Sequence, residues 1–94
     1  MSAYVVAEIE VTDPPKYDTY RPRVPATLEK YGGKFVARGG KVELLEGGPE
    51  PKRIVIIQFA DAAAARRWYE SPEYQEALKI RLASSTGRVF IVEG

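Results

Sequence analysis

The 94-residue sequence contains no cysteine, no histidine and no asparagine. Without cysteine the chain has no disulfide, no thiolate nucleophile and no thiolate zinc site. Without histidine it has no Ser-His-Asp machinery and no histidine ligand for haem, zinc or non-haem iron. Catalysis would have to come from other polar side chains, from the backbone or from the substrate itself. We therefore expect neither a metal nor another cofactor.

Excess charge of one sign and long apolar runs are also lacking. The chain has 14 basic and 13 acidic residues, a net charge of +1, so no basic surface for nucleic acid is expected. No apolar run approaches the length of a membrane span, and no secretory signal is recognisable, so we expect a cytoplasmic protein. The apolar fraction of 45% is typical of a globular protein. Residues 1–94 are predicted to form one domain, whose thin core a partner subunit would support.

Apolar periodicity and helix signals predict the element order β-α-β-β-α-β. Asp13, Asp61 and Ser71 are candidate N-caps, and prolines follow the first and third of them. Pro22 would break the first helix into two pieces, and Gly32 would end it. The patterns predict strands over residues 3–11, 34–38, 52–59 and 88–92, helices over 14–31, 62–69 and 72–82, and a short extended run over 41–46.

This order predicts an α+β fold, the ferredoxin-like plait, with a four-stranded antiparallel sheet and helices on one face. The other sheet face would be open. Tyr4, Val6, Ile54 and Ile56 point toward it by strand alternation, which is too much apolar surface to leave in water. We therefore expect a homodimer in which a second copy covers the open face.

Several short motifs follow one another as in a known family. They are Tyr31-Gly32-Gly33, Arg38-Gly39-Gly40, Leu45-Glu46-Gly47, Arg53 and Ser71-Pro72-Glu73-Tyr74. With them the chain resembles the DUF1330 family over essentially its whole length. The resemblance implies a dimeric α/β barrel, in which the sheets of two subunits face each other and enclose a cavity. It implies no activity. Relatives on this fold include monooxygenases, isomerases and stress-responsive barrels, some of which depend on a histidine or an asparagine that this chain lacks.

Three polar side chains form the first candidate site: Glu8, Arg38 and Gln58. Alternation places all three on the open face, where they would converge in a mostly apolar space between the subunits. Arg38 would bind a carboxylate through two hydrogen bonds, and Glu8 would act as a base if burial raised its pKa. A structural Glu8–Arg38 ion pair at the dimer interface explains the same residues, and we favour it.

Tyr20 is the fourth candidate, because the break at Pro22 would turn its phenol toward the cavity mouth. A phenol there could donate a hydrogen bond or a proton to a developing oxyanion. Simple packing of the first helix on the sheet explains Tyr20 and its neighbours Tyr17 and Tyr31 better.

Two other motifs favour structural roles. The glycine pairs at 32–33 and 39–40 do not run from a strand into a helix N-terminus, as a phosphate loop would, so they predict a helix end and a turn. Lys79 and Arg81 lie on a helix among glutamates, which predicts a solvated face with local ion pairs.

Two classes of function are left open. The first is a small-molecule enzyme that acts on a carboxylate or phenolic metabolite between the two sheets without metal or haem. The second is a non-catalytic dimer that binds a ligand or has a structural role. The fold does not distinguish these two classes of function, because one scaffold serves many reactions.

Overall fold

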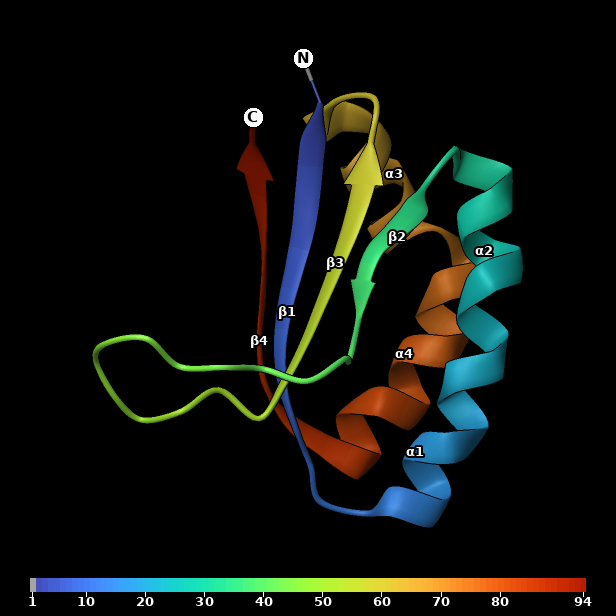
Figure 1. The fold of residues 1–94 in the computed structure, drawn as a ribbon. Helices are drawn as coiled ribbons and strands as arrows, with labels where there is room; N and C mark the ends of the chain where they lie inside the picture. The colour runs from blue at the N-terminus through green and yellow to red at the C-terminus, as the bar shows by residue number, and fades with distance from the viewer. Residues whose placement is uncertain (1) are drawn as a thin grey trace.

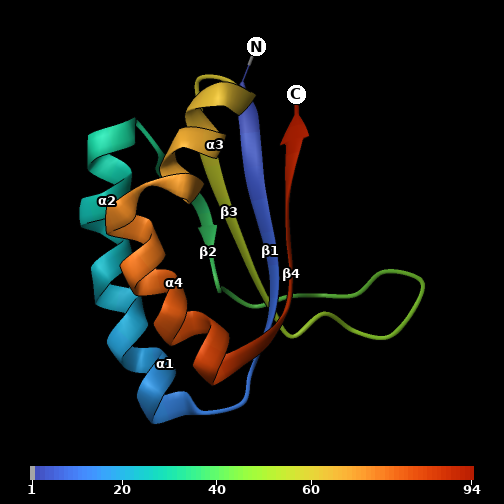
Figure 2. The same ribbon diagram turned by 180° about the vertical axis from the view of Figure 1, so that it is seen from behind.

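Four antiparallel strands form a twisted sheet, and all the helices lie on one of its faces, as a computed structural model that describes residues 2–94 shows (Figures 1 and 2). The strand order is β2-β3-β1-β4. This confirms the predicted α+β ferredoxin-like fold. The elements are β1 (Ala3–Val11), α1 (Pro14–Tyr20), the 3-10 turn η1 (Arg21–Arg23), α2 (Val24–Tyr31), β2 (Lys34–Arg38), β3 (Arg53–Phe59), α3 (Ala62–Glu70), α4 (Pro72–Ser84) and β4 (Ser85–Glu93).

The helix boundaries follow the predicted capping residues. The carboxylate of Asp13 accepts a hydrogen bond from the backbone N–H of Lys16, and the Ser71 hydroxyl accepts one from the N–H of Tyr74. The 3-10 turn around Pro22 separates α1 from α2, as the missing proline N–H predicts. Gly32 ends α2 with φ +75°, a left-handed conformation that glycine adopts without strain. None of the helices in residues 2–94 has the length and apolar character that crossing a membrane requires.

Two predicted boundaries were wrong. Residues 41–46 are not a strand but belong to a long connection from β2 to β3, which projects from the sheet on the face opposite the helices (Figures 1 and 2). Strand β4 starts at Ser85 rather than at residue 88, because it pairs with the whole of β1 down to Val11. The Ser84 carbonyl accepts hydrogen bonds from the N–H groups of Thr12 and Asp13, which joins this end of β4 to the end of β1.

The core lies between the sheet and the helices. From the sheet it contains Val5, Ile9, Ile57 and Phe59, all buried. From the helices it takes a group of aromatic side chains around Trp68, which is 2% exposed and lies 4.1 Å from the ring of Tyr74, centroid to centroid. Aromatic side chains bury the most apolar area per residue, so these rings supply much of the core of a small domain.

A β-bulge in β2 decides where Arg38 points. Phe35 lies opposite Ile57, and Ala37 lies opposite the next residue of β3, Ile56, so Val36 is an extra residue. A single extra residue reverses the alternation of every side chain beyond it. Arg38, opposite Val55, therefore faces the helices and not the open face of the sheet.

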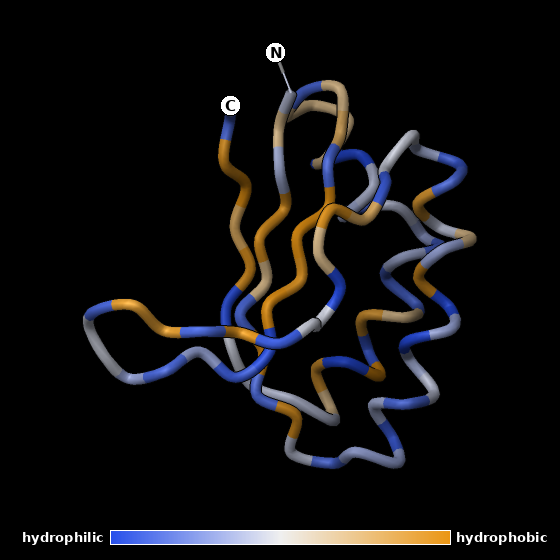
Figure 3. Tube along the Cα trace, in the orientation of Figure 1, coloured by the Kyte–Doolittle hydropathy of each residue, from blue (hydrophilic) through white to orange (hydrophobic). Residues whose placement is uncertain are grey.

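The strands of the sheet are rich in apolar residues (Figure 3), and several of these residues are on the open face. Val6 lies at its centre, opposite Ile56 on one side and Phe90 on the other. Phe90 and Val92 on β4 are exposed, and so are Leu44 and Leu45 in the connection that projects on the same side. Exposed apolar patches on folded proteins are often interaction sites, so this face is a candidate for one.

Candidate functional site

A small cavity lies between the sheet and the helices. Its volume is about 40 Å³, room for the centres of about three water molecules. The sheet supplies an aliphatic floor: Val5, Ala7, Ile9, Val55 and Val89. The helices supply an aromatic roof: Tyr17, Tyr20, Trp68 and Tyr74. An apolar space with a few polar groups aimed into it is the usual form of a small-molecule site.

Arg81 on α4 is the most unusual residue of this cavity. Its side chain lines the cavity although the residue is only 7% exposed. No ion pair within residues 2–94 involves it, and its buried Nε has no hydrogen-bond partner there. Buried arginines are almost always paired, because removing a charge from water without compensation is costly. A buried guanidinium without an anionic partner would gain an ion pair and hydrogen bonds by binding an anion.

Two further arginines enter the cavity from the sheet. Arg38 stacks on the ring of Phe35, with its guanidinium carbon 4.3 Å from the ring centroid, and donates a hydrogen bond of 2.9 Å to the carbonyl of Arg21. Arg53 extends over the ring of Tyr17, and its Nε is also buried without a partner in the described chain. Neither makes an ion pair with any of residues 2–94. Arg21 of η1 lines the cavity as well and forms an ion pair with Asp18 over 3.9 Å, and no carboxylate among residues 2–94 lines the cavity.

Gly39 makes the position of Arg53 possible. A Cβ atom on Gly39 would lie 2.1 Å from Nη1 of Arg53, and the residue has φ +70°. Only glycine meets both requirements without strain. Gly39 therefore does more than make the turn that the sequence indicated, whereas a Cβ atom on Gly40 would contact nothing.

Tyr20 and Tyr74 form a buried hydroxyl pair in the roof, with 2.9 Å between their oxygens. Burial raises the pKa of Tyr20 far above its usual value of 10.0, and the neighbouring Tyr74 adds to that rise. Burial also raises the pKa of Tyr74, against the opposing effects of its hydrogen bond with Tyr20 and of the charge and side-chain hydrogen bond of Arg81. Both phenols are thus protonated near neutral pH and can donate hydrogen bonds. Within residues 2–94 no group of three or more acidic side chains could hold a metal ion.

Replacing Tyr20 by phenylalanine should lower the free energy of unfolding by about 1–3 kcal/mol, because the buried Tyr74 hydroxyl loses its partner. Tyr17→Phe is the matched control; the Tyr17 hydroxyl makes no hydrogen bond with residues 2–94, so the substitution should cost no more than about 0.5 kcal/mol. Since the folded pKa of Tyr20 is raised, wild-type stability should also fall as pH rises above about 10, and less so in Tyr20→Phe. Urea unfolding at equal protein concentration measures both effects. Equal costs for the two variants would contradict this account.

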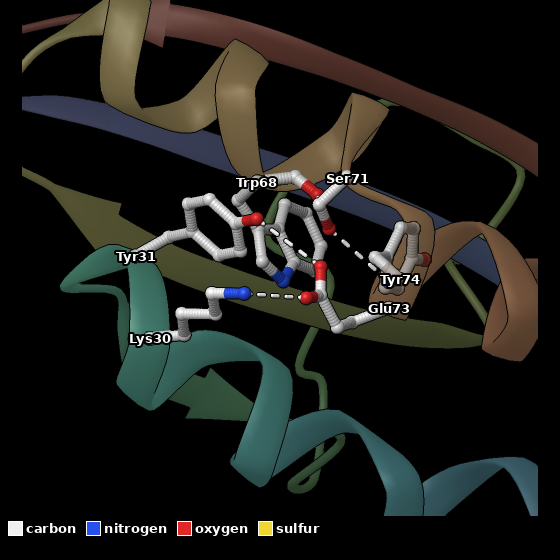
Figure 4. Close-up of polar contacts among 6 residues, drawn as sticks. All are labelled: Lys30, Tyr31, Trp68, Ser71, Glu73 and Tyr74. Carbon is white, nitrogen blue, oxygen red and sulfur yellow. Dashed lines mark hydrogen bonds and ion pairs between the residues drawn. The ribbon is translucent and has the colours of Figure 1, made fainter.

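An exposed cluster ties α2 to α4 above the roof (Figure 4). Lys30 and the hydroxyl of Tyr31 both donate to the carboxylate of Glu73, over 2.6 Å and 3.1 Å. The hydrogen bond from Lys30 lowers the pKa of Glu73. Beneath them, Nε1 of Trp68 donates to the hydroxyl of Thr27 over 3.0 Å. These contacts hold the aromatic rings over the cavity.

The structure does not bring the predicted open-face site together. Glu8 does lie on the open face, but its partner there is Arg88 on the neighbouring strand, over 2.9 Å. The predicted ion pair between Glu8 and Arg38 is wrong, because the bulge at Val36 sends Arg38 to the other face. Gln58 donates a hydrogen bond to the Ser2 hydroxyl over 3.1 Å and does not approach Arg38. Tyr20 lines a cavity, but that cavity lies within the subunit.

Sequence reasoning missed Arg53, Tyr74 and Arg81 as members of one site. The assignment of Arg81 to a solvated face was wrong. The signal was present, because Tyr74, Ala77, Leu78 and Arg81 follow the three- and four-residue spacing of a buried helix stripe, and all four are buried.

The family model described as a domain of unknown function, DUF1330, matches residues 2–94. A protein of unknown function from Rhodopseudomonas palustris has a similar structure, with 21% identity, a TM-score of 0.81, and coverage of 99% of this chain and 82% of that one. A dimeric ferredoxin-like protein of unknown function from Jannaschia sp. CCS1 has 15% identity and a TM-score of 0.81 over the full length of both chains.

A third similar structure is that of SnoaB, a cofactor-independent oxygenase from Streptomyces nogalater. It has 20% identity, a TM-score of 0.70, and coverage of 99% of this chain and 92% of that one. No curated protein matches the chain. At these identities the structural likenesses establish the fold.

Proposed function

The chain belongs to the DUF1330 family, and from that premise and from the three cavity arginines that form no ion pair within residues 2–94, Arg38, Arg53 and Arg81, we propose that it binds a small carboxylate or phenolate anion without a metal or haem. The observation that carries the proposal is the buried guanidinium of Arg81, which forms no ion pair within residues 2–94 and whose Nε has no hydrogen-bond partner there. The proposal moves the expected site from the space between two sheets to the space between the sheet and the helices of each subunit.

Energetics favour an anion as the missing partner of Arg81. An uncompensated buried charge lowers the free energy of unfolding of a protein by roughly 3–5 kcal/mol. A carboxylate bound to that charge would remove this cost. Guanidinium and carboxylate match in geometry, since two parallel N–H···O bonds can form. The phenols of Tyr20 and Tyr74 lie in the same cavity and add neutral donors. Every polar side chain lining the cavity is a guanidinium, a phenol or an indole.

The same donors would suit catalysis that relies on the acidity of the substrate. A guanidinium stabilises an enolate or phenolate, and a protonated phenol pair can pass a proton to or from it. The likeness in fold to SnoaB, a cofactor-independent oxygenase, is compatible with such chemistry. A non-catalytic ligand-binding protein is the alternative, and it uses the same cavity and the same arginines.

Binding can be tested with matched pairs of anion and neutral amide: acetate with acetamide, and propionate with propionamide. Trp68 is the single tryptophan and lines the cavity, so its fluorescence reports occupancy alongside calorimetry. We expect a Kd of about 1 mM or tighter for the anions, near the limit for ligands of so few atoms. At a hundredfold excess over Kd, the anion should stabilise the fold by about 2.7 kcal/mol. Equal effects of the amides, or no effect beyond that of chloride at the same ionic strength, would refute the proposal.

We also propose that two copies pair through the open face of the sheet. Val6, Ile56 and Phe90 form an apolar centre there, and the exposed leucines of the β2–β3 connection extend it. One similar protein, from Jannaschia, is described as dimeric. The Glu8–Arg88 ion pair would lie at the border of such an interface, where a partly exposed pair costs little to retain.

A further inference from the structure

We infer that the ligand of this cavity is a short dianion, with one anionic group at Arg81 and a second at the Arg38–Arg53 pair. The inference rests on the proposed function and specifies its ligand. A dicarboxylate with a short apolar link between its two groups has the required chemistry.

The two sheet arginines act as one subsite because of the strand register. Arg38 lies opposite Val55, and Arg53 precedes Val55 by two residues on the same face of β3. Such diagonal neighbours have Cβ atoms about 7–8 Å apart, so long side chains can converge on one group. The guanidinium of Arg53 also passes directly beside Gly39, the residue that follows Arg38.

This subsite has unused capacity for an anion. Two guanidinium groups carry ten N–H donors by their chemistry, yet within residues 2–94 only one side-chain hydrogen bond from this pair forms, from Arg38 to the Arg21 carbonyl. Nε of Arg53 is buried and unpartnered. Two adjacent cations repel each other, so an anion between them relieves repulsion and supplies hydrogen bonds together.

Arg81 forms the second subsite because it comes from the opposite layer. It projects from α4, whereas Arg38 and Arg53 project from the sheet, and all three line the same cavity. A single compact ion such as phosphate carries its charge at one centre and would pair only with the arginines of the sheet or with Arg81 of the helix layer. A molecule with two anionic groups can pair with both. The volume of about 40 Å³ limits the link between them to a short one, and the side chains of Val55 and Tyr17 make an apolar link suitable.

The inference is tested by titrating oxalate, malonate, succinate and glutarate against acetate and propionate at constant ionic strength. We expect the best dicarboxylate to bind at least about tenfold tighter than the monocarboxylates, since a charge-assisted hydrogen bond contributes about 1.5–3 kcal/mol. We also expect a clear optimum in chain length. Arg38→Gln and Arg53→Gln should each reduce the preference for the dianion about tenfold or more while the acetate Kd changes less than about twofold.

Arg23→Gln is the matched control. It removes one positive charge from the neighbouring 3-10 turn, and Arg23 does not line the cavity. This variant should keep the full preference for the dianion. If dicarboxylates and monocarboxylates bind equally, or if Arg23→Gln reduces the preference as much as the cavity variants do, the dianion inference is wrong while the anion site stands. If inorganic phosphate binds as tightly as the best dicarboxylate, the inference that the ligand carries two separate anionic groups is also wrong. If no anion binds at all, the proposed function itself fails.

Discussion

Replacing Arg81 by methionine is expected to make the free protein more stable and to abolish its binding of small carboxylates. Methionine has a similar length and fills an irregular apolar space well. Because the substitution removes a buried charge that has no partner in residues 2–94, the free energy of unfolding should rise by about 1–4 kcal/mol. In a domain of this size each kcal/mol raises Tm by about 4–8 °C. Acetate affinity should fall at least about a hundredfold, the loss expected on removing one partner of a buried charge pair.

The opposite signs of the two effects distinguish a binding role from a structural one. If Arg81 stabilised the fold, the methionine variant would unfold more easily than the wild type. Arg67→Met is the matched control, because Arg67 lies exposed on α3 outside the cavity. Its substitution should change stability by no more than about 0.5 kcal/mol and leave acetate binding intact. Calorimetric Tm and Kd values for the three proteins at equal concentration give the answer.

Placing glutamate at Ile56 is expected to convert the protein into monomers. Ile56 lies on a central strand of the open face, opposite Val6. In a twofold dimer the substitution occurs twice, so two uncompensated carboxylates would enter the interface. Each such charge costs about 3–5 kcal/mol, so the dimer dissociation constant should rise by more than about a thousandfold. Sedimentation equilibrium over a range of concentrations measures it.

Leu82→Glu serves as the control for the dimer experiment. Leu82 is 64% exposed on α4, on the helix side of the sheet. The new charge there should leave the dimer unchanged. A wild-type protein that sediments as a monomer at micromolar concentration, or equal sedimentation of wild type and Ile56→Glu, would contradict the open-face interface.

The fold followed from the sequence because several local signals agreed. Asp13, Ser71 and Gly32 marked helix ends, and the alternation in β1 distinguished its buried face from its open one. Each of these features depends on residues close together in the chain. The family resemblance pointed to the same fold, and the match over residues 2–94 confirmed it.

The candidate site could not be derived in the same way. The prediction for Arg38 depended on unbroken alternation from residue 34 onward, and one extra residue, Val36, reversed its direction. A bulge arises from pairing with a strand far along the chain, so nothing local in β2 marks it. Arg81 was a different case. Its spacing from Tyr74 and Leu78 places it on the buried stripe of α4, whereas its charge and the neighbouring glutamates favour an exposed face, so the two signals conflict.

Arg81, buried and without an ion-pair partner in residues 2–94, is proposed to bind the anion. The most direct test of this proposal is the NMR signal of the Arg81 Nε–H group, assigned by its loss in Arg81→Met, during titration with acetate and then with acetamide. The signal is expected to shift with acetate in a saturable manner, with the Kd measured by calorimetry, and not to shift with acetamide. An Arg81 Nε–H signal that does not shift with acetate, or that shifts equally with acetamide, would contradict an anion site at Arg81.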